Sequence, residues 1–408
     1  MRRMLVRVSA AAGMAACLSV LATGPSWAQL DEKKPFRIGA TLPKSGPYSQ
    51  FGSFVEPALA IAVNQLNAAG GILGRKVELI IRDDASNPGR ALLATKELVE
   101  EQKVDFLYPE IVSGLVLASL PYTTEKKMIT ITPGASPSIG DGEKFPYSFQ
   151  YGDIATERVP AMIAAMKKLG GKKVGILVST NPATVTLGDT MASDLVKKAS
   201  MDLAGYKQFS VDAKDLTSQL QSLRDAGADI IAFDGAGKDS VRIVMTGMQV
   251  LSWKANVVGE PANVYGDLTE QVPASVQSQF YSIMHRIAVR NGAQRAGAAD
   301  FASELRNRGP IENIVLTSES RDCLFLAKWA FETAMKEKGS TSAESVKEVL
   351  ESLSSRDYPE SNSLVLGNPR YMGKDHTTSN LDYSKLWGVI RVSAPVNGAY
   401  EGDILDSR

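Results

Sequence analysis

The stretch FRIGATLPKSGPYSQFG, residues 36–52, contains the segment that decides the fold. Its first part, residues 36–42, is an apolar run of the kind that forms a buried strand. Residues 52–69 follow with apolar side chains at spacings of three and four, which predicts a helix that buries one face. Gly70 and Gly71 end this helix, because glycine takes up the left-handed conformation without a steric penalty. The stretch therefore predicts a strand, a short loop and a helix, the first unit of an α/β fold.

The same alternation continues along the chain in two series. Predicted strands cover residues 36–42, 77–81, 104–107, 128–132, 174–178, 208–211, 229–233, 256–258 and 385–392. Predicted helices cover residues 52–69, 90–101, 115–125, 187–203, 216–225, 240–250, 300–307, 318–336 and 342–353. Alternating strands and helices predict parallel sheets covered by helices on both faces. Two successive series favour two similar lobes over one long sheet.

The first residues of the chain predict export. Three arginines within the first seven residues precede an apolar run over residues 8–21 that is too short to span a membrane. Ser26-Trp27-Ala28 places small residues at the first and third positions before Gln29, as a signal peptidase requires. We expect residues 1–28 to be a cleaved signal peptide and the mature chain to lie in the periplasm. Arg2–Leu5 weakly matches a twin-arginine signal and Met14–Cys17 a lipoprotein box, so the export route and lipidation of Cys17 stay open.

Composition excludes several classes of function. Without residues 1–28 the chain has 42 basic and 45 acidic residues, and so small a net charge argues against a nucleic-acid partner. The remaining chain is longer than a domain with a single hydrophobic core usually is, which favours two domains. Cys323 is the only cysteine left, so we expect no intrachain disulfide and a buried thiol in an apolar helix.

Motifs of common enzymes and metal sites are incomplete. Residues 235–240 lack a glycine that a phosphate-binding loop requires, and residues 134–138 lack the last glycine of a nucleophile elbow. Residues 70–74 follow a helix instead of a strand, so they are not a dinucleotide fingerprint. His285 and His376 are far apart, with no cysteine pair nearby. We therefore expect no catalytic residues, no metal and no cofactor.

Four motifs, in their order and spacing, carry a resemblance to a known family. They are SGPYSQFG at residues 45–52, IAVNQLNAAGGILGR at 61–75, IRDD at 81–84 and ITPGAS at 131–136. Together they resemble the Leu/Ile/Val-binding family of periplasmic binding proteins. In the second series DAGADII, residues 225–231, is similar to the approach to a strand in that family, and beyond residue 282 the likeness depends on segment order. The resemblance implies a class I fold, with two Rossmann-like lobes, each a mostly parallel sheet flanked by helices, joined by three hinge strands.

Both lobes are expected to be discontinuous in sequence. We expect residues 29–150 and 283–360 to form lobe 1, and residues 151–282 and 361–408 to form lobe 2. The resemblance implies the substrate-binding component of an ABC importer, a monomer that delivers a small carboxylate-bearing ligand to an ABC permease in the inner membrane. The alternative is a periplasmic sensor of the same fold for an amide, urea or organic acid.

The resemblance also implies a grip for the ligand carboxylate on lobe 1. Ser113, Gly134, Ala135 and Ser136 match the family positions that bind it with main-chain amides and hydroxyls. All four follow predicted strands, and ligands of α/β sheets bind at the carboxyl ends of strands. Ser113 and Ser136 could instead be helix caps, which is the commonest role of serine in a strand-to-helix loop.

Further candidates concern the walls of the site. Tyr48 and Tyr151, with Phe233, could supply a wall for an apolar or aromatic ligand, although Tyr48 could also only complete a turn. Glu260 falls at or next to the family carboxylate that binds a ligand ammonium, with a surface carboxylate as the alternative. Asp234 could accept a hydrogen bond from the ligand or cap the following helix.

Two positions depart from the amino-acid binders of the family. Leu187 and Ala236 stand where those proteins present tyrosines from the second lobe. An aromatic or aliphatic acid, or an amide, therefore fits the sequence about as well as an α-amino acid does.

Overall fold

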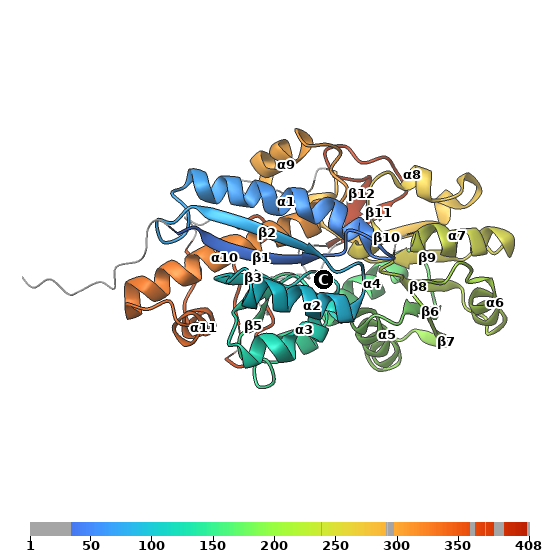
Figure 1. The fold of residues 1–408 in the computed structure, drawn as a ribbon. Coiled ribbons are helices and arrows are strands. Elements are labelled where there is room, and N and C mark those ends of the chain that lie inside the picture. Colours follow the sequence, from blue (N-terminus) through green and yellow to red (C-terminus); the bar gives the residue numbers. More distant parts are fainter. Residues whose placement is uncertain are drawn as a thin grey trace, which may run out of the picture.

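The computed structural model describes residues 34–237, 239–290, 292, 298–359, 364–371, 373–378 and 387–405. The predicted signal peptide lies outside the described residues. The described chain forms two α/β lobes side by side, each built on its own sheet (Figure 1). In this part of the chain, no helix combines the length and the apolar character needed to cross a membrane.

Lobe 1 is a five-stranded parallel sheet in the order β2-β1-β3-β4-β5. Its strands are β1 (Phe36–Leu42), β2 (Val77–Asp83), β3 (Phe106–Tyr108), β4 (Thr130–Thr132) and β5 (Ser148–Gln150). Its helices are α1 (Ser49–Ala68), α2 (Pro88–Glu100), α3 (Ser113–Glu125), α10 (Ile314–Lys338) and α11 (Ala343–Glu351). Alternate residues of β1, from Phe36 to Leu42, join the large core that α1 and α10 cover. On the other face Gly39 lets Val104 pack closely, since a Cβ at this glycine would lie 3.0 Å from its Cγ1.

Lobe 2 is a seven-stranded sheet in the order β12-β11-β10-β9-β8-β6-β7. Its strands are β6 (Lys173–Ser179), β7 (Asp202–Phe209), β8 (Ile230–Asp234), β9 (Asn256–Gly259), β10 (Phe280–His285), β11 (Trp387–Arg391) and β12 (Gly402–Ile404). The helices around it are α4 (Ala155–Lys168), α5 (Pro182–Asp194), α6 (Thr217–Asp225), α7 (Ser240–Val250), α8 (Leu268–Gln271) and α9 (Ala298–Arg306). Only β11 pairs antiparallel with β10 and β12, and the other pairs in this sheet are parallel. The predicted fold class, two mostly parallel sheets flanked by helices, is confirmed.

The strand order creates a crevice in each lobe. In lobe 1 the chain runs from β1 outward to β2 and then returns to β3 on the other side of β1. In lobe 2 it runs from β6 outward to β7 and returns to β8 in the same way. At such a switch point the loops that follow the two central strands diverge, and the gap between them is where ligands bind in open α/β sheets.

The sequence pattern did not predict several of the elements. These are β5, α4, α8, β10 and β12. α4 contains Pro160, which lacks an N–H and disfavours a helical conformation at Val159, so its local signal is weak. Packing compensates, because Val159, Met162 and Met166 are fully buried against the lobe 2 sheet. The helix predicted for residues 187–203 is also too long, because strand β7 already begins at Asp202.

The contacts of the C-terminal segments differ from the expected lobe boundaries. Leu364 and Tyr371 join the core of lobe 1, where the Tyr371 hydroxyl donates to the Gln150 carbonyl at 2.9 Å, whereas Val365 and Leu366 join the core cluster of lobe 2. His376 stacks on Phe149 of lobe 1, with ring centroids 4.0 Å apart. Residues 361–408 were all expected in lobe 2, but among the described residues of this range only β11 and β12 join its sheet. The expected boundary at residues 282 and 283 also falls inside β10 (Phe280–His285).

Candidate ligand-binding site

The two crevices face each other across one cavity. It encloses about 420 Å³ of space between protein atoms, part of it open to solvent. Lobe 1 contributes Phe51, Ile111, Val112, Ser113, Pro133 and Ala135 from the segments that follow β1, β3 and β4, and α10 adds Leu316. Lobe 2 contributes Arg158, Asn181, Ala183, Thr184, Asp234, Ala236, Glu260 and Ala262. Most of these lobe 2 residues follow β6, β8 and β9.

The lobe 1 wall presents hydrogen-bond donors. Ser113 is the first residue of α3, and its hydroxyl oxygen accepts the Ser136 N–H at 3.0 Å. Among the described residues, no acceptor bonds the main-chain N–H of Ser113 or Ala135. The Ser136 hydroxyl is buried and also has no hydrogen-bond partner in this part of the chain. The structure therefore brings Ser113, Ala135 and Ser136 together with unbonded donors. Ser113 and Ala135 line the cavity, whereas Ser136, which is 1% exposed, does not.

Neither serine forms a side-chain cap hydrogen bond, although Ser136 occupies an N-cap position. The N-cap of α3 is Val112, so Ser113 already lies inside the helix. Ser136 is the N-cap residue of the short 3-10 helix Pro137–Gly140, but its hydroxyl forms no cap hydrogen bond. Neither hydroxyl is engaged by a helix end.

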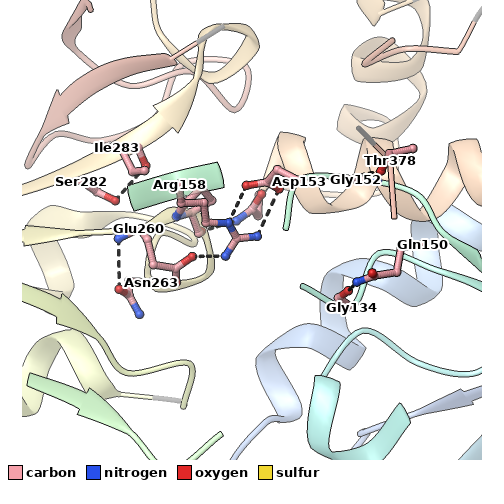
Figure 2. Close-up of polar contacts among 12 residues, drawn as sticks. Gly134, Gln150, Gly152, Asp153, Arg158, Glu260, Asn263, Ser282, Ile283 and Thr378 are labelled. Atoms are coloured by element: carbon pink, nitrogen blue, oxygen red, sulfur yellow. Dashed lines mark hydrogen bonds and ion pairs between the residues drawn. The ribbon is translucent and has the colours of Figure 1, made fainter. Parts of the chain in front are cut away.

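Gly134 has a different position from its neighbours. Its N–H donates to the Thr132 hydroxyl at 3.1 Å, and its carbonyl accepts from the Gln150 side chain (Figure 2). The same Gln150 amide donates to the Ser136 carbonyl at 2.9 Å. Gly134 and Gln150 thus hold the shape of the loop after β4, and the Gly134 N–H is not available to a ligand.

The lobe 2 wall is built around a buried guanidinium. Arg158, on α4, donates through Nε and Nη2 to Asp153, the latter at 3.1 Å, and through Nη1 to Glu260 (Figure 2). All three side chains are at most 5% exposed. Burial disfavours the charged form of Asp153, but the interactions with Arg158 outweigh this effect of burial and lower the pKa of the carboxyl. Glu260 is therefore a buried, paired carboxylate and not a surface residue.

Asp234 lies in the same wall at the end of β8. It is 2% exposed, and its Oδ1 has no hydrogen-bond partner among the described residues. Burial, and then the neighbouring Glu260, raise the pKa of Asp234 well above its ordinary value. Burial also raises the pKa of Glu260, although Arg158 opposes that shift. Asp234 does not cap α7, whose N-cap is Asp239.

A second carboxyl pair lies behind the lobe 1 wall. Glu110 immediately precedes the lining segment 111–113, and its Oε2 accepts the N–H groups of Ile111 and Val112. Burial, and then the nearby Asp84, raise the pKa of Glu110. Burial raises the pKa of Asp84 to about 7. Each side chain has one buried oxygen without a hydrogen-bond partner in the described structure.

The aromatic candidates do not line the cavity. The Tyr151 hydroxyl donates to Asp322 at 3.0 Å and to the Gly367 carbonyl at 2.8 Å, which directs the ring into the core of lobe 1. Phe233 stacks on Phe209 in the lobe 2 core, with centroids 6.0 Å apart. Tyr48 is buried in lobe 1. A hydrogen bond with the Asn181 side chain partly offsets the rise in the pKa of Tyr48 that burial causes.

The two departures from the family pattern have different positions. Ala236 lines the cavity, and its carbonyl accepts the Gln50 side-chain amide of lobe 1 at 3.2 Å. Leu187 is fully buried in the core of lobe 2 and does not reach the cavity. Of the two departures, only the one at Ala236 therefore alters the wall of the cavity.

Sequence reasoning missed Arg158, Asn181 and Thr184. Arg158 lies on α4, a helix that was not predicted, so nothing placed it near Glu260, 102 positions away. Asn181 is the N-cap of α5 and Thr184 lies in its first turn, after β6, at the carboxyl end of a predicted strand. Their position after a predicted strand was the signal from which Asn181 and Thr184 could have been identified.

Comparison with known proteins identifies the family. A family model described as periplasmic binding protein matches residues 35–381. The Leu/Ile/Val-binding protein homolog 3 of Brucella melitensis is 25% identical over 219 residues, which are 52% of this chain and 59% of that protein. The matched part of the chain thus spans about three fifths of that relative.

Solved structures share the fold at low identity. The branched-chain amino acid transporter substrate-binding protein LivJ of Streptococcus pneumoniae, in complex with isoleucine, has a TM-score of 0.73 at 20% identity, covering 91% of this chain and 99% of that one. An ABC transporter solute-binding protein of R. palustris in complex with 4-hydroxybenzoate has a TM-score of 0.73 at 17% identity, with coverages of 91% and 96%. The chain therefore belongs to the periplasmic binding protein family, with a class I fold of the Leu/Ile/Val-binding type.

Proposed function

We propose that this protein is the periplasmic substrate-binding component of an ABC importer, and that it captures a small dipolar ligand between its lobes. The observation that carries the proposal is the pairing of opposite walls in one cavity. Lobe 1 offers unbonded N–H groups at Ser113 and Ala135, which suit a carboxylate. Lobe 2 offers buried carboxyls at Asp234 and Glu260, which suit a cationic or hydrogen-bond-donating end.

The remaining lining favours a ligand with an apolar body. Apolar contacts come from Phe51, Ile111, Val112 and Leu316, and the small side chains of the lining alanines leave space for the ligand body. An α-amino acid with an apolar side chain fits these features best. LivJ, which has a similar fold, was solved with isoleucine, and the R. palustris protein with 4-hydroxybenzoate. Because both have the same TM-score, fold likeness does not choose between these ligand classes.

Capture would depend on closure of the lobes. The lobes already touch beside the cavity, where Gln50 bonds to the Ala236 carbonyl at 3.2 Å. A ligand that contacts both walls stabilises this closed arrangement, since it favours the state in which both sets of contacts exist. The closed monomer would then present a joined surface to an inner-membrane permease. As members of a binding-protein family, such proteins bind their ligand without converting it.

A thermal-shift screen of the chain from Gln29 onward tests the proposal. The compounds are the proteinogenic amino acids, aromatic acids, dicarboxylates and amides. A ligand at a hundred times its Kd should stabilise the protein by about 2.7 kcal/mol and raise Tm. Calorimetry should then give one-to-one stoichiometry with the ligand recovered unchanged, and a chemically altered ligand would contradict the proposal.

Matched variants locate the binding site. Ala183 lines the cavity, so Ala183→Phe should remove the thermal shift by filling the space. Ala226 is exposed at the end of α6, so Ala226→Phe should preserve the shift. Equal shifts in both variants would place the ligand elsewhere.

A further inference from the structure

The lobe 2 wall and the adjoining hinge bury more carboxyls than cations. Asp153, Asp234, Glu260 and Glu319 are all at most 3% exposed, and among the described residues Arg158 is the cation that forms ion pairs with this group. If all four carboxyls were ionised, the cluster would bury three uncompensated negative charges. Such burial is costly, and a buried group gives up its charge instead.

Arg158 determines which carboxyls keep their charge. Its Nε and Nη2 are directed at Asp153 and its Nη1 at Glu260, so these two carboxylates share the guanidinium. Glu319, on α10, lies against Gly152, where an added Cβ would be 2.8 Å from its Oε1, and it does not line the cavity. Asp234 and Glu260 both line the cavity, and each has one oxygen without a partner in the described structure. The difference is that Arg158 forms an ion pair with Glu260 and not with Asp234.

We infer that Asp234, not the Arg158-paired Glu260, is the specificity-determining acceptor for the cationic group of the ligand, and that it exchanges its own proton for that group on binding. The inference rests on the proposed function. In the empty cavity the Asp234 carboxyl keeps its O–H. When a ligand ammonium arrives, that proton passes to the solvent buffer, the ammonium keeps its three N–H groups, and the charge of the wall is unchanged.

The surroundings of Asp234 agree with this exchange. Burial is the main cause that raises its pKa, and Glu260 adds to it while Arg158 opposes it. From its own lobe it is faced by Glu260, Arg158 and Asn263, and from lobe 1 by Tyr48. Arg158 already donates to two other carboxylates, so a ligand ammonium can supply the positive charge that Asp234 lacks.

The test is calorimetry with leucine, isoleucine, valine and phenylalanine, each compared with the acid that lacks its amino group. Titration at one pH in phosphate and in Tris buffer measures protons released. The wild type should release about one proton per bound amino acid, and its affinity should rise with pH, by up to about tenfold per unit. The deaminated acids should release none.

Asp234→Asn keeps the shape of the protonated side chain and should fold like the wild type, as judged by circular dichroism and thermal unfolding. It should bind the amino acids at least about tenfold more weakly, without proton release, because the new amide cannot ionise. Its affinity for the deaminated acids should change less than about threefold. Asp212→Asn, at an exposed position, is the matched control and should retain both the affinity and the proton release.

The outcomes separate the inference from the proposed function. Proton release that persists in Asp234→Asn, or amino-acid binding by the wild type without release, overturns the inference. Binding of deaminated acids alone overturns it as well, while leaving the importer function in place. A folded wild-type protein that binds none of these compounds, nor any compound of the thermal-shift screen, overturns both.

Discussion

Replacing Arg158 by methionine removes the guanidinium but keeps an unbranched side chain of similar length. Two carboxylates, Asp153 and Glu260, would then lose their partner at sites that are 3% and 0% exposed. Removing one partner of a buried ion pair typically costs about 3 to 5 kcal/mol. At about 2 to 4 °C per kcal/mol, Tm should fall by about 6 to 20 °C.

The pH dependence of this loss has a definite sign. In the wild type Arg158 outweighs burial and lowers the pKa of Asp153, so its contribution is present above the ordinary carboxyl pKa of about 4 and is lost as pH falls through the lowered value. Without Arg158, burial raises the pKa of Asp153 and Glu260, and the variant gains stability as these groups take up protons. The stability gap between wild type and variant should therefore narrow as pH is lowered from about 7 towards 4.

Urea unfolding followed by circular dichroism measures both effects. A triple variant, Arg158→Met with Asp153→Asn and Glu260→Gln, leaves no unpaired charge and should recover most of the loss. Wild-type stability in the single variant would refute the reasoning. So would a triple variant that is less stable than the single one.

Three further predictions concern the lobe 1 wall, the carboxyl pair behind it and the core of lobe 1. Ser136→Ala should weaken ligand binding by about 1 to 3 kcal/mol with little change in Tm, because its hydroxyl has no hydrogen-bond partner among the described residues. Ser113→Ala should also lower stability, because it leaves the buried Ser136 N–H without an acceptor. Isothermal and scanning calorimetry distinguish the two variants, and equal Tm values would contradict the bond between the two residues. Burial raises the pKa of Asp84 to about 7, so stability should fall as pH rises from about 4 to 7, and Asp84→Asn should flatten this slope in urea titrations; an unchanged slope would reject the assignment. Cys323 is fully buried and its thiol pKa is raised, so a thiol reagent should label it only after unfolding, and rapid labelling of the native protein would contradict this.

The first wall of the site was accessible to sequence reasoning because its signal is local. Ser113, Ala135 and Ser136 each follow a strand that the apolar pattern predicts, and the carboxyl ends of parallel strands meet at one edge of a sheet. The loops after β1, β3 and β4 therefore had to converge once the strands were identified. What the pattern did not reveal was which amides remain free: the Gly134 N–H is satisfied by Thr132, while that of Ala135 is not.

The second wall was only partly accessible, because its chemistry depends on contacts between distant segments. Asp234 and Glu260 end predicted strands, so their positions were identifiable. Arg158, which changes the ionisation of both, lies on a helix whose sequence signal Pro160 weakens. The direction of a side chain was also beyond the sequence, as Tyr151 turns into the core to bond Asp322 instead of facing the ligand.

The sequence by itself determined the alternation of strands and helices, the two-lobed class I fold and the family, because these follow from local apolar periodicity and from motifs of contiguous residues. Tertiary structure alone decided which carboxyls are paired, which donors are unbonded and which aromatic rings reach the cavity. Ionisation and hydrogen bonding depend on burial and on neighbours within a few ångströms, and in this protein those neighbours are often more than a hundred positions apart in the chain.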